Sequence, residues 1–212
     1  MQPGLTNVGA GRTSFLFQIN VTRRCQLRCS HCYILSDKKD TSPDMSEAEF
    51  LHVVQGIVDH MKLDYEFSRR YTFVDIHVIG GEPSMLGVDF FKAALPKAKA
   101  MLSEIPQEVA FSIVTNLVTH EALEVARLFD KVATSYERST RFNKRKQEEI
   151  WKNNVRTLMA ESKNPSLPGP KDFSVTTALV KPVVQAGAVS MIEELVELSL
   201  IHISEPTRRR GI

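Results

Sequence analysis

Two hydrophobic patterns alternate along the chain. Short runs of four to eight residues are rich in β-branched side chains and mostly apolar throughout. That pattern is typical of strands buried on both faces of a sheet. It predicts strands at residues 15–20, 72–79, 108–114, 131–135 and 173–180.

Longer segments between these runs carry apolar residues at helical spacing. The first begins at Ser46, and Glu49 follows three positions later, so the two form a capping box in which each side chain satisfies the other's backbone N–H. This spacing predicts an amphipathic helix. Its apolar face comprises Phe50, Val54, Ile57, Val58 and Met61.

Further helices are expected over 88–103, 120–129 and 147–161, and a fifth helix is expected to start near Val189. Pro96 lies inside the second helix and is expected to kink it or delay its start, because proline has no backbone N–H to donate. Residues 164–170 hold three prolines and a glycine, which predicts a loop.

The alternation of strand and helix, repeated five times, predicts an α/β fold with a parallel sheet and right-handed crossovers. In such sheets the catalytic and ligand-binding residues lie at the carboxyl ends of the strands. The run that begins at Cys25 follows the first strand, Gly80-Gly81-Glu82-Pro83 follows the second, Thr115-Asn116 follows the third, and Ser135 ends the fourth. We therefore expect these four segments to meet at one rim.

The three cysteines are the strongest functional signal. Cys25, Cys29 and Cys32 are the only cysteines in the chain, and they form a CxxxCxxC run. This spacing supplies three thiolates to one small volume, whereas a four-iron cluster normally takes four. One iron is then free to bind and break a small molecule.

Composition narrows the class of protein. The chain has 212 residues, 42% hydrophobic and 25% charged, as in an ordinary soluble globular protein. A formal net charge of +2 gives no indication of nucleic acid, and no apolar run is long enough to cross a membrane. The cysteines are too close in sequence for a disulfide framework, and their odd number would leave one unpaired, so we expect a reducing cytoplasm with the thiols reserved for metal.

These features together resemble the radical S-adenosylmethionine (radical SAM) enzymes, and the resemblance covers most of residues 15–197. Within that family, the motifs are most similar to those of the anaerobic sulfatase-maturating and peptide-modifying branch. These motifs are the Cys29-Ser-His-Cys32-Tyr33 sequence, the Gly-Gly-Glu-Pro turn and the Thr-Asn turn. The resemblance implies a partial (β/α) barrel with parallel strands and outer helices. It typically has six units, and here it would be truncated after about five.

The resemblance also implies the cofactors and the reaction. A [4Fe-4S] cluster, reduced by an external electron donor, would cleave S-adenosylmethionine to methionine and a 5′-deoxyadenosyl radical, which abstracts hydrogen from the substrate. The expected substrate is a peptide or protein side chain. A small-molecule or cofactor-biosynthesis enzyme with the same core is the second hypothesis, and a zinc-stabilised binding module without catalysis is the third.

The family's functional positions carry over to eleven residues. The implied cluster ligands are Cys25, Cys29 and Cys32. Gly80, Gly81 and Glu82 would line the methionine amino group of S-adenosylmethionine, and Asn116 and Ser135 would contact its ribose or carboxylate. Arg138 or Arg141 would pair with the carboxylate, for which a guanidinium is well shaped. His31 would pack beside the adenine.

Simpler interpretations exist for most of these positions. The three cysteines would suit zinc, with His31 or a distant histidine as fourth ligand, although structural zinc prefers two separated ligand pairs. The Gly-Gly-Glu-Pro and Thr-Asn segments are also ordinary turn material, and the basic stretch 141–146 is typical of a solvated surface. Asp75 and His77 share one face of the second strand, which would allow a buried polar pair, although a satisfied core histidine is the expectation.

The two ends of the chain differ from the middle. Residues 1–14 are expected to form a loose leader before a core domain at 15–197. Residues 198–212 resemble the translation of a transposase adapter used in sequencing libraries, which would make them a non-native tail. The alternative is a sixth strand at 200–203 followed by a basic terminus.

Overall fold

The computed structural model describes residues 13–30, 32, 34, 42–137, 141, 142, 144–164, 166, 167, 169–176, 185, 187, 189, 192, 193 and 196. Five strands form one sheet in the order β1-β2-β3-β4-β5, and every neighbouring pair is parallel. This architecture confirms the predicted α/β fold with its parallel sheet. The strands are β1 (Ser14–Thr22), β2 (Phe73–Gly80), β3 (Glu108–Val114), β4 (Lys131–Ser135) and β5 (Asp172–Thr176).

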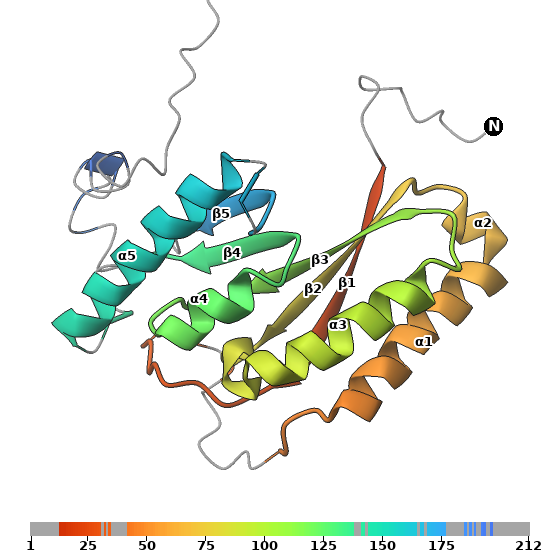
Figure 1. Cartoon of the computed structure of the whole chain (residues 1–212), viewed down its shortest axis with the longest axis horizontal. Coiled ribbons are helices and arrows are strands. Elements are labelled where there is room, and N and C mark those ends of the chain that lie inside the picture. The colour runs from red at the N-terminus through yellow and green to blue at the C-terminus, as the bar shows by residue number, and fades with distance from the viewer. Residues whose placement is uncertain are drawn as a thin grey trace, which may run out of the picture.

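The connections between strands carry the helices (Figure 1). In chain order they are α1 (Glu47–Leu63), α2 (Tyr65–Ser68), the 3₁₀ helix η1 (Pro83–Leu86), α3 (Val88–Leu102), α4 (His120–Ala126) and α5 (Arg145–Ser162). The short helices α2 and η1 were not predicted, because four residues are too few to show a period. The predicted helix near Val189 and the segment 177–180 of the last strand lie outside the continuously described residues.

The predicted cap of α1 is confirmed in detail. The backbone N–H of Glu49 donates to the Ser46 hydroxyl at 3.3 Å, and the N–H of Ser46 donates to the Glu49 carboxylate at 2.7 Å. The expectation for Pro96 was wrong in one respect: α3 starts at Val88 and runs past the proline. Pro96 and Lys92 are both exposed, so water can reach the Lys92 carbonyl that loses its intrahelical partner.

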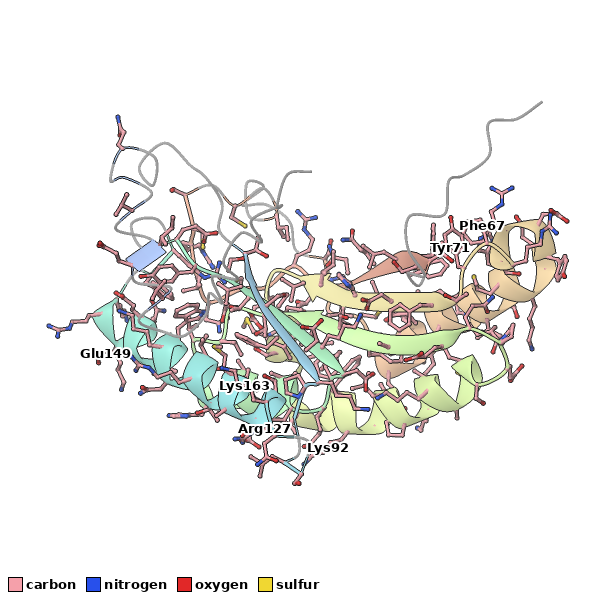
Figure 2. All side chains as sticks on the ribbon, turned by 90° about the horizontal axis from the view of Figure 1, so that it is seen from above. Phe67, Tyr71, Lys92, Arg127, Glu149 and Lys163 are labelled. Carbon is pink, nitrogen blue, oxygen red and sulfur yellow. The ribbon has the colours of Figure 1, made fainter. Side chains whose placement is uncertain are left out.

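The longer helices cover one face of the sheet. Helices α1, α3, α4 and α5 pack side by side in that order, and Figure 2 shows them gathered below the strands. The core lies between them and the sheet, where Val74, Ile76 and Val78 of β2 are fully buried. Within the described residues, no helix combines the length and the apolar character needed to span a bilayer.

The other face of the sheet is partly open, which corrects the expectation that the strands are buried on both faces. Asp75 and His77 alternate with the core residues of β2 and are only partly buried, and Leu16 on β1 is 45% exposed. One register row on this face is polar across all five strands. It runs Gln18, His77, Ser112, Lys131 and Asp172, and we call it the polar row.

Candidate functional site

A cavity of about 360 Å³ lies at the carboxyl ends of the strands. The segments after β1, β2 and β3 and the end of β4 all contribute to its wall, as the parallel topology predicts. Nine of the eleven candidate residues line it, and the other two, His31 and Arg138, lie outside the described residues. The nine are Cys25, Cys29, Cys32, Gly80, Gly81, Glu82, Asn116, Ser135 and Arg141.

The two glycines hold the cysteine segment against the end of β2. A Cβ on Gly81 would lie 2.3 Å from the carbonyl oxygen of Arg24, and one on Gly80 would lie 2.4 Å from that of Thr22. In this space the N–H of Gly81 donates to Thr22 O at 2.7 Å, and the N–H of Glu82 donates to Arg24 O at 2.7 Å. The glycines are therefore required first for contact between two backbones, before any contact with a ligand.

Glu82 joins the turn after β2 to the turn after β3. Its side chain is 1% exposed, and its carboxylate accepts hydrogen bonds from the hydroxyl of Thr115 at 2.6 Å, the N–H of Asn116 at 2.6 Å and the N–H of Ser84 at 3.1 Å. Both carboxylate oxygens thus already accept hydrogen bonds from other groups of the protein. A contact to a cofactor amino group, as the sequence suggests, would share these oxygens.

Arg141 contributes positive charge to the cavity. It is 8% exposed and pairs with Glu137 at 3.3 Å, and its Nε is buried without a hydrogen-bond partner in the described structure. The solvated-surface interpretation of 141–146 is wrong for this residue, because Arg141 turns into the cavity while Arg145 remains exposed. A buried donor without a partner fits an anionic group, such as the carboxylate of S-adenosylmethionine.

The thiols share one region of the cavity. Burial raises the pKa of the Cys25 thiol, opposed by hydrogen bonds from Leu27 N and the Asn116 amide. Burial also raises the pKa of the Cys29 thiol, opposed by the nearby Arg141 charge. Cys29 interacts electrostatically with both Cys25 and Cys32, so the three lie near one another.

A cluster is compatible with this arrangement. Among the described residues, no group of three or more His, Cys, Asp or Glu side chains could hold a single metal ion. A [4Fe-4S] cube has a different requirement, because each thiolate ligates a separate iron and the sulfurs surround the cluster instead of converging on one ion. Cys25, Cys29 and Cys32 all line the same cavity, as ligands around one cluster must.

Several residues of the site were not predicted from sequence. Asn154 of α5 donates to the carbonyls of Leu117 at 2.9 Å and Thr119 at 2.8 Å, which holds the segment after Asn116. Leu117 has a φ of 54°, an unusual backbone conformation for leucine. Asn154 interrupts the apolar stripe of its helix, and that interruption is a signal available in the sequence.

Asp75 and His77 form a polar pair on the open face of the sheet, not a satisfied core histidine. The Asp75 carboxylate lies 3.5 Å from His77 Nε2 and 2.8 Å from Lys131 Nζ, and it accepts from the Ser112 hydroxyl at 2.5 Å. Burial alone would raise its pKa, but these partners outweigh burial and lower the pKa to about 2.

Comparisons with known proteins yield structural matches but no match by sequence. No family model and no curated protein matches the chain. The solved structure of histidine-tagged anSMEcpe with bound AdoMet matches at a TM-score of 0.66 and 13% identity, over 88% of this chain and 47% of that chain. Native anSMEcpe with bound AdoMet also matches at 0.66 and 13%, over 89% and 50%.

A third match is native anSMEcpe with bound AdoMet and Cp18Cys peptide, at a TM-score of 0.59 and 13% identity, over 88% of this chain and 48% of that chain. The chain thus spans about half the length of these structures. anSMEcpe is a radical SAM anaerobic sulfatase-maturating enzyme. At this identity the likeness concerns the fold, and the chain has the partial α/β fold of the radical SAM type.

Proposed function

We propose that the chain is the core of a radical SAM enzyme that binds a [4Fe-4S] cluster through Cys25, Cys29 and Cys32. The observation that carries the proposal is that all three cysteines line one cavity with the Gly80–Glu82 turn and Arg141. This cavity lies at the catalytic end of a sheet whose fold is similar to that of an AdoMet-bound enzyme.

The protein's own residues would hold and orient the cofactors. Gly80 and Gly81 fix the cysteine segment, and Arg141 Nε provides a buried donor for the carboxylate of S-adenosylmethionine. Apolar residues of the wall limit the access of water: Leu27, Ile34, Ile79 and Val114. When bound, such a cluster supplies the electron for reductive cleavage of S-adenosylmethionine, which in turn supplies the hydrogen-abstracting radical.

The proposed substrate is a peptide or protein side chain. A peptide is bound in one of the matching anSMEcpe structures, which supports this class over a small molecule. The polar row begins at Gln18, which also lines the cavity, and continues over the open face through His77, Ser112 and Lys131. Of these, His77 and Lys131 are partly exposed and could contact a substrate that enters from that side. The proposal also includes an external electron donor that reduces the cluster and a reducing compartment, such as the cytoplasm, in which the protein works.

Anaerobic reconstitution with iron and sulfide tests the function. We expect a brown protein with about four irons per chain that releases 5′-deoxyadenosine when it is reduced with S-adenosylmethionine present. Stoichiometric zinc without visible absorption would contradict the proposal and support a binding module. Mass spectrometry of short peptides encoded beside the gene, after incubation with the reconstituted enzyme, separates peptide modification from small-molecule chemistry.

Substitution of one ligand tests the assignment of the cysteines. We expect Cys29→Ala to abolish assembly of the cube, because only two thiolates remain, whereas Ser30→Ala alters an exposed residue of the same segment and should leave the iron content unchanged. Iron and sulfide analysis after reconstitution measures both. A full four-iron cluster in Cys29→Ala would show that Cys29 is not a ligand.

A further inference from the structure

Cys25 has a hydrogen-bond environment that differs from that of Cys29. Two N–H groups point at the Cys25 sulfur: Leu27 N at 3.4 Å and the Asn116 side-chain Nδ2 at 3.7 Å. The Cys29 sulfur is instead placed as a donor, 3.9 Å from the carbonyl oxygen of Arg141. Cys25 is therefore a thiol whose deprotonated form can accept hydrogen bonds from two N–H groups of the protein.

The orientation of the Asn116 amide follows from its other contacts. The backbone N–H of Val118 lies 3.1 Å from one end of the amide, and a backbone N–H can only donate, so that end is the oxygen Oδ1. The Nε2 of Gln26 also contacts this oxygen, at 3.3 Å. The Asn116 NH₂ group must then face the opposite way, toward the sulfur of Cys25.

Asn116 is held in this position before any ligand arrives. Its backbone N–H is bound to the buried carboxylate of Glu82 at 2.6 Å, and the residue is only 4% exposed. The contact therefore joins three segments of the rim: the cysteine segment after β1, the turn after β2 and the turn after β3. An amide restrained in this way keeps its N–H close to the sulfur without a further loss of side-chain entropy.

We propose that Asn116 is a positioning residue that donates an N–H···S hydrogen bond to the Cys25 thiolate and thereby raises the reduction potential of the cluster. The inference rests on the proposed function, because the bond affects a potential only when Cys25 is an iron ligand. Reduction adds one negative charge to the cluster, and a donor on a ligating sulfur stabilises the more negative state. This role differs from the contact to ribose or carboxylate that the sequence suggests.

The test is a redox titration followed by electron paramagnetic resonance on the reconstituted chain. Asn116→Asp keeps the size of the side chain but replaces the N–H donor with a carboxylate oxygen. We expect the equilibrium constant for one-electron reduction to fall at least tenfold, which is a midpoint lowered by about 59 mV. Asn153→Asp makes the same chemical change at an exposed position of α5 and should leave the midpoint unchanged.

A second variant covers the case in which the aspartate prevents cluster assembly. Asn116→Ala removes the donor without adding charge, and we expect a fall of about threefold in the same equilibrium constant. A wild-type chain that assembles no cluster would overturn the proposed function. A wild-type cluster whose midpoint is unchanged or raised in Asn116→Ala would overturn only the inference about Asn116, because the added charge of Asn116→Asp lowers the midpoint even without a lost hydrogen bond.

Discussion

The two faces of the sheet differ in what they are built to do. The face toward the helices is a continuous apolar core, and its central residues Ile76, Phe111 and Ile113 are fully buried. The opposite face carries the polar row, with Asp75 beside it. Because side chains alternate along a strand, successive residues of the same strands contribute to the two faces in turn.

This difference shows how one sheet separates stability from chemistry. The core face is filled by apolar packing, and its central residues Ile76, Phe111 and Ile113 are closed to a ligand. The open face keeps charged and polar side chains within reach of a molecule, and its end merges with the cavity at Gln18 and Ile79. Substitutions on the two faces should therefore have different consequences, and three experiments test the contrast.

The largest expected effect is on the core face. Phe111→Ala should lower the free energy of unfolding by about 3–5 kcal/mol, because a fully buried aromatic ring leaves a cavity. Leu16→Ala on the open face is the matched control, and since Leu16 is 45% exposed, we expect a loss of at most about 1 kcal/mol. Urea unfolding measures both values. Equal losses would show that the open face is packed as tightly as the core.

A smaller loss is expected at the rim, where the two faces meet. Glu82→Ala leaves the buried donors of Ser84, Thr115 and Asn116 without their acceptor, and we expect about 2–4 kcal/mol of destabilisation. Glu66→Ala, at a side chain that is 67% exposed, should change stability by less than about 0.5 kcal/mol. Thermal unfolding of the two variants compares them.

The affinity of reconstituted Glu82→Ala for S-adenosylmethionine adds a second measurement. Without Glu82 the turn after β3 loses its anchor, so the amide of Asn116 is no longer held beside Cys25. We expect weaker binding of S-adenosylmethionine together with the loss of stability. Unchanged stability would show that the three hydrogen bonds to Glu82 contribute nothing net to the fold.

The sequence predicts the elements well because their signals are local. The bounds of β3 and β4 coincide with the predicted ranges, and the buried face of α1 comprises the five predicted residues. The positions of the site at the rim follow from topology: in a parallel sheet every strand ends at the same edge. That rule brought the segments after β1, β2 and β3 together without any knowledge of contacts.

The contacts themselves were not predictable. Glu82 was interpreted as a cofactor contact, but its three hydrogen bonds depend on where the turn after β3 lies in space. Gln26 looks like an ordinary surface residue, and although Asn154 interrupts an apolar stripe, only the tertiary structure shows that both bind the segment around Asn116. The open face was missed because β2 looked apolar throughout, although Asp75 and His77 alternate with its buried residues.

The smallest expected effect concerns the charge network of the open face, and it depends on pH. Asp75 has a pKa lowered from 3.8 to about 2 in the folded protein. A carboxyl with a lowered folded-state pKa stabilises the fold above its unfolded pKa, so this contribution is full above about pH 4 and is lost as the pH falls toward 2. A shift of this size in a fully protected site is equivalent to about 2.5 kcal/mol, and solvent screening on the open face reduces it to roughly 1 kcal/mol.

Comparison of unfolding free energies between pH 5 and pH 2 in the wild type and in Asp75→Asn isolates this contribution. The wild-type protein should lose about 1 kcal/mol more than the variant over that range, because only the wild type must protonate a carboxylate held by Lys131 and Ser112. Asp172→Asn changes an exposed residue of the polar row, and we expect less than about 0.5 kcal/mol at neutral pH. Parallel curves for the wild type and Asp75→Asn would mean that water screens Asp75 from its partners. The open face would then be a solvated surface without a fixed charge network.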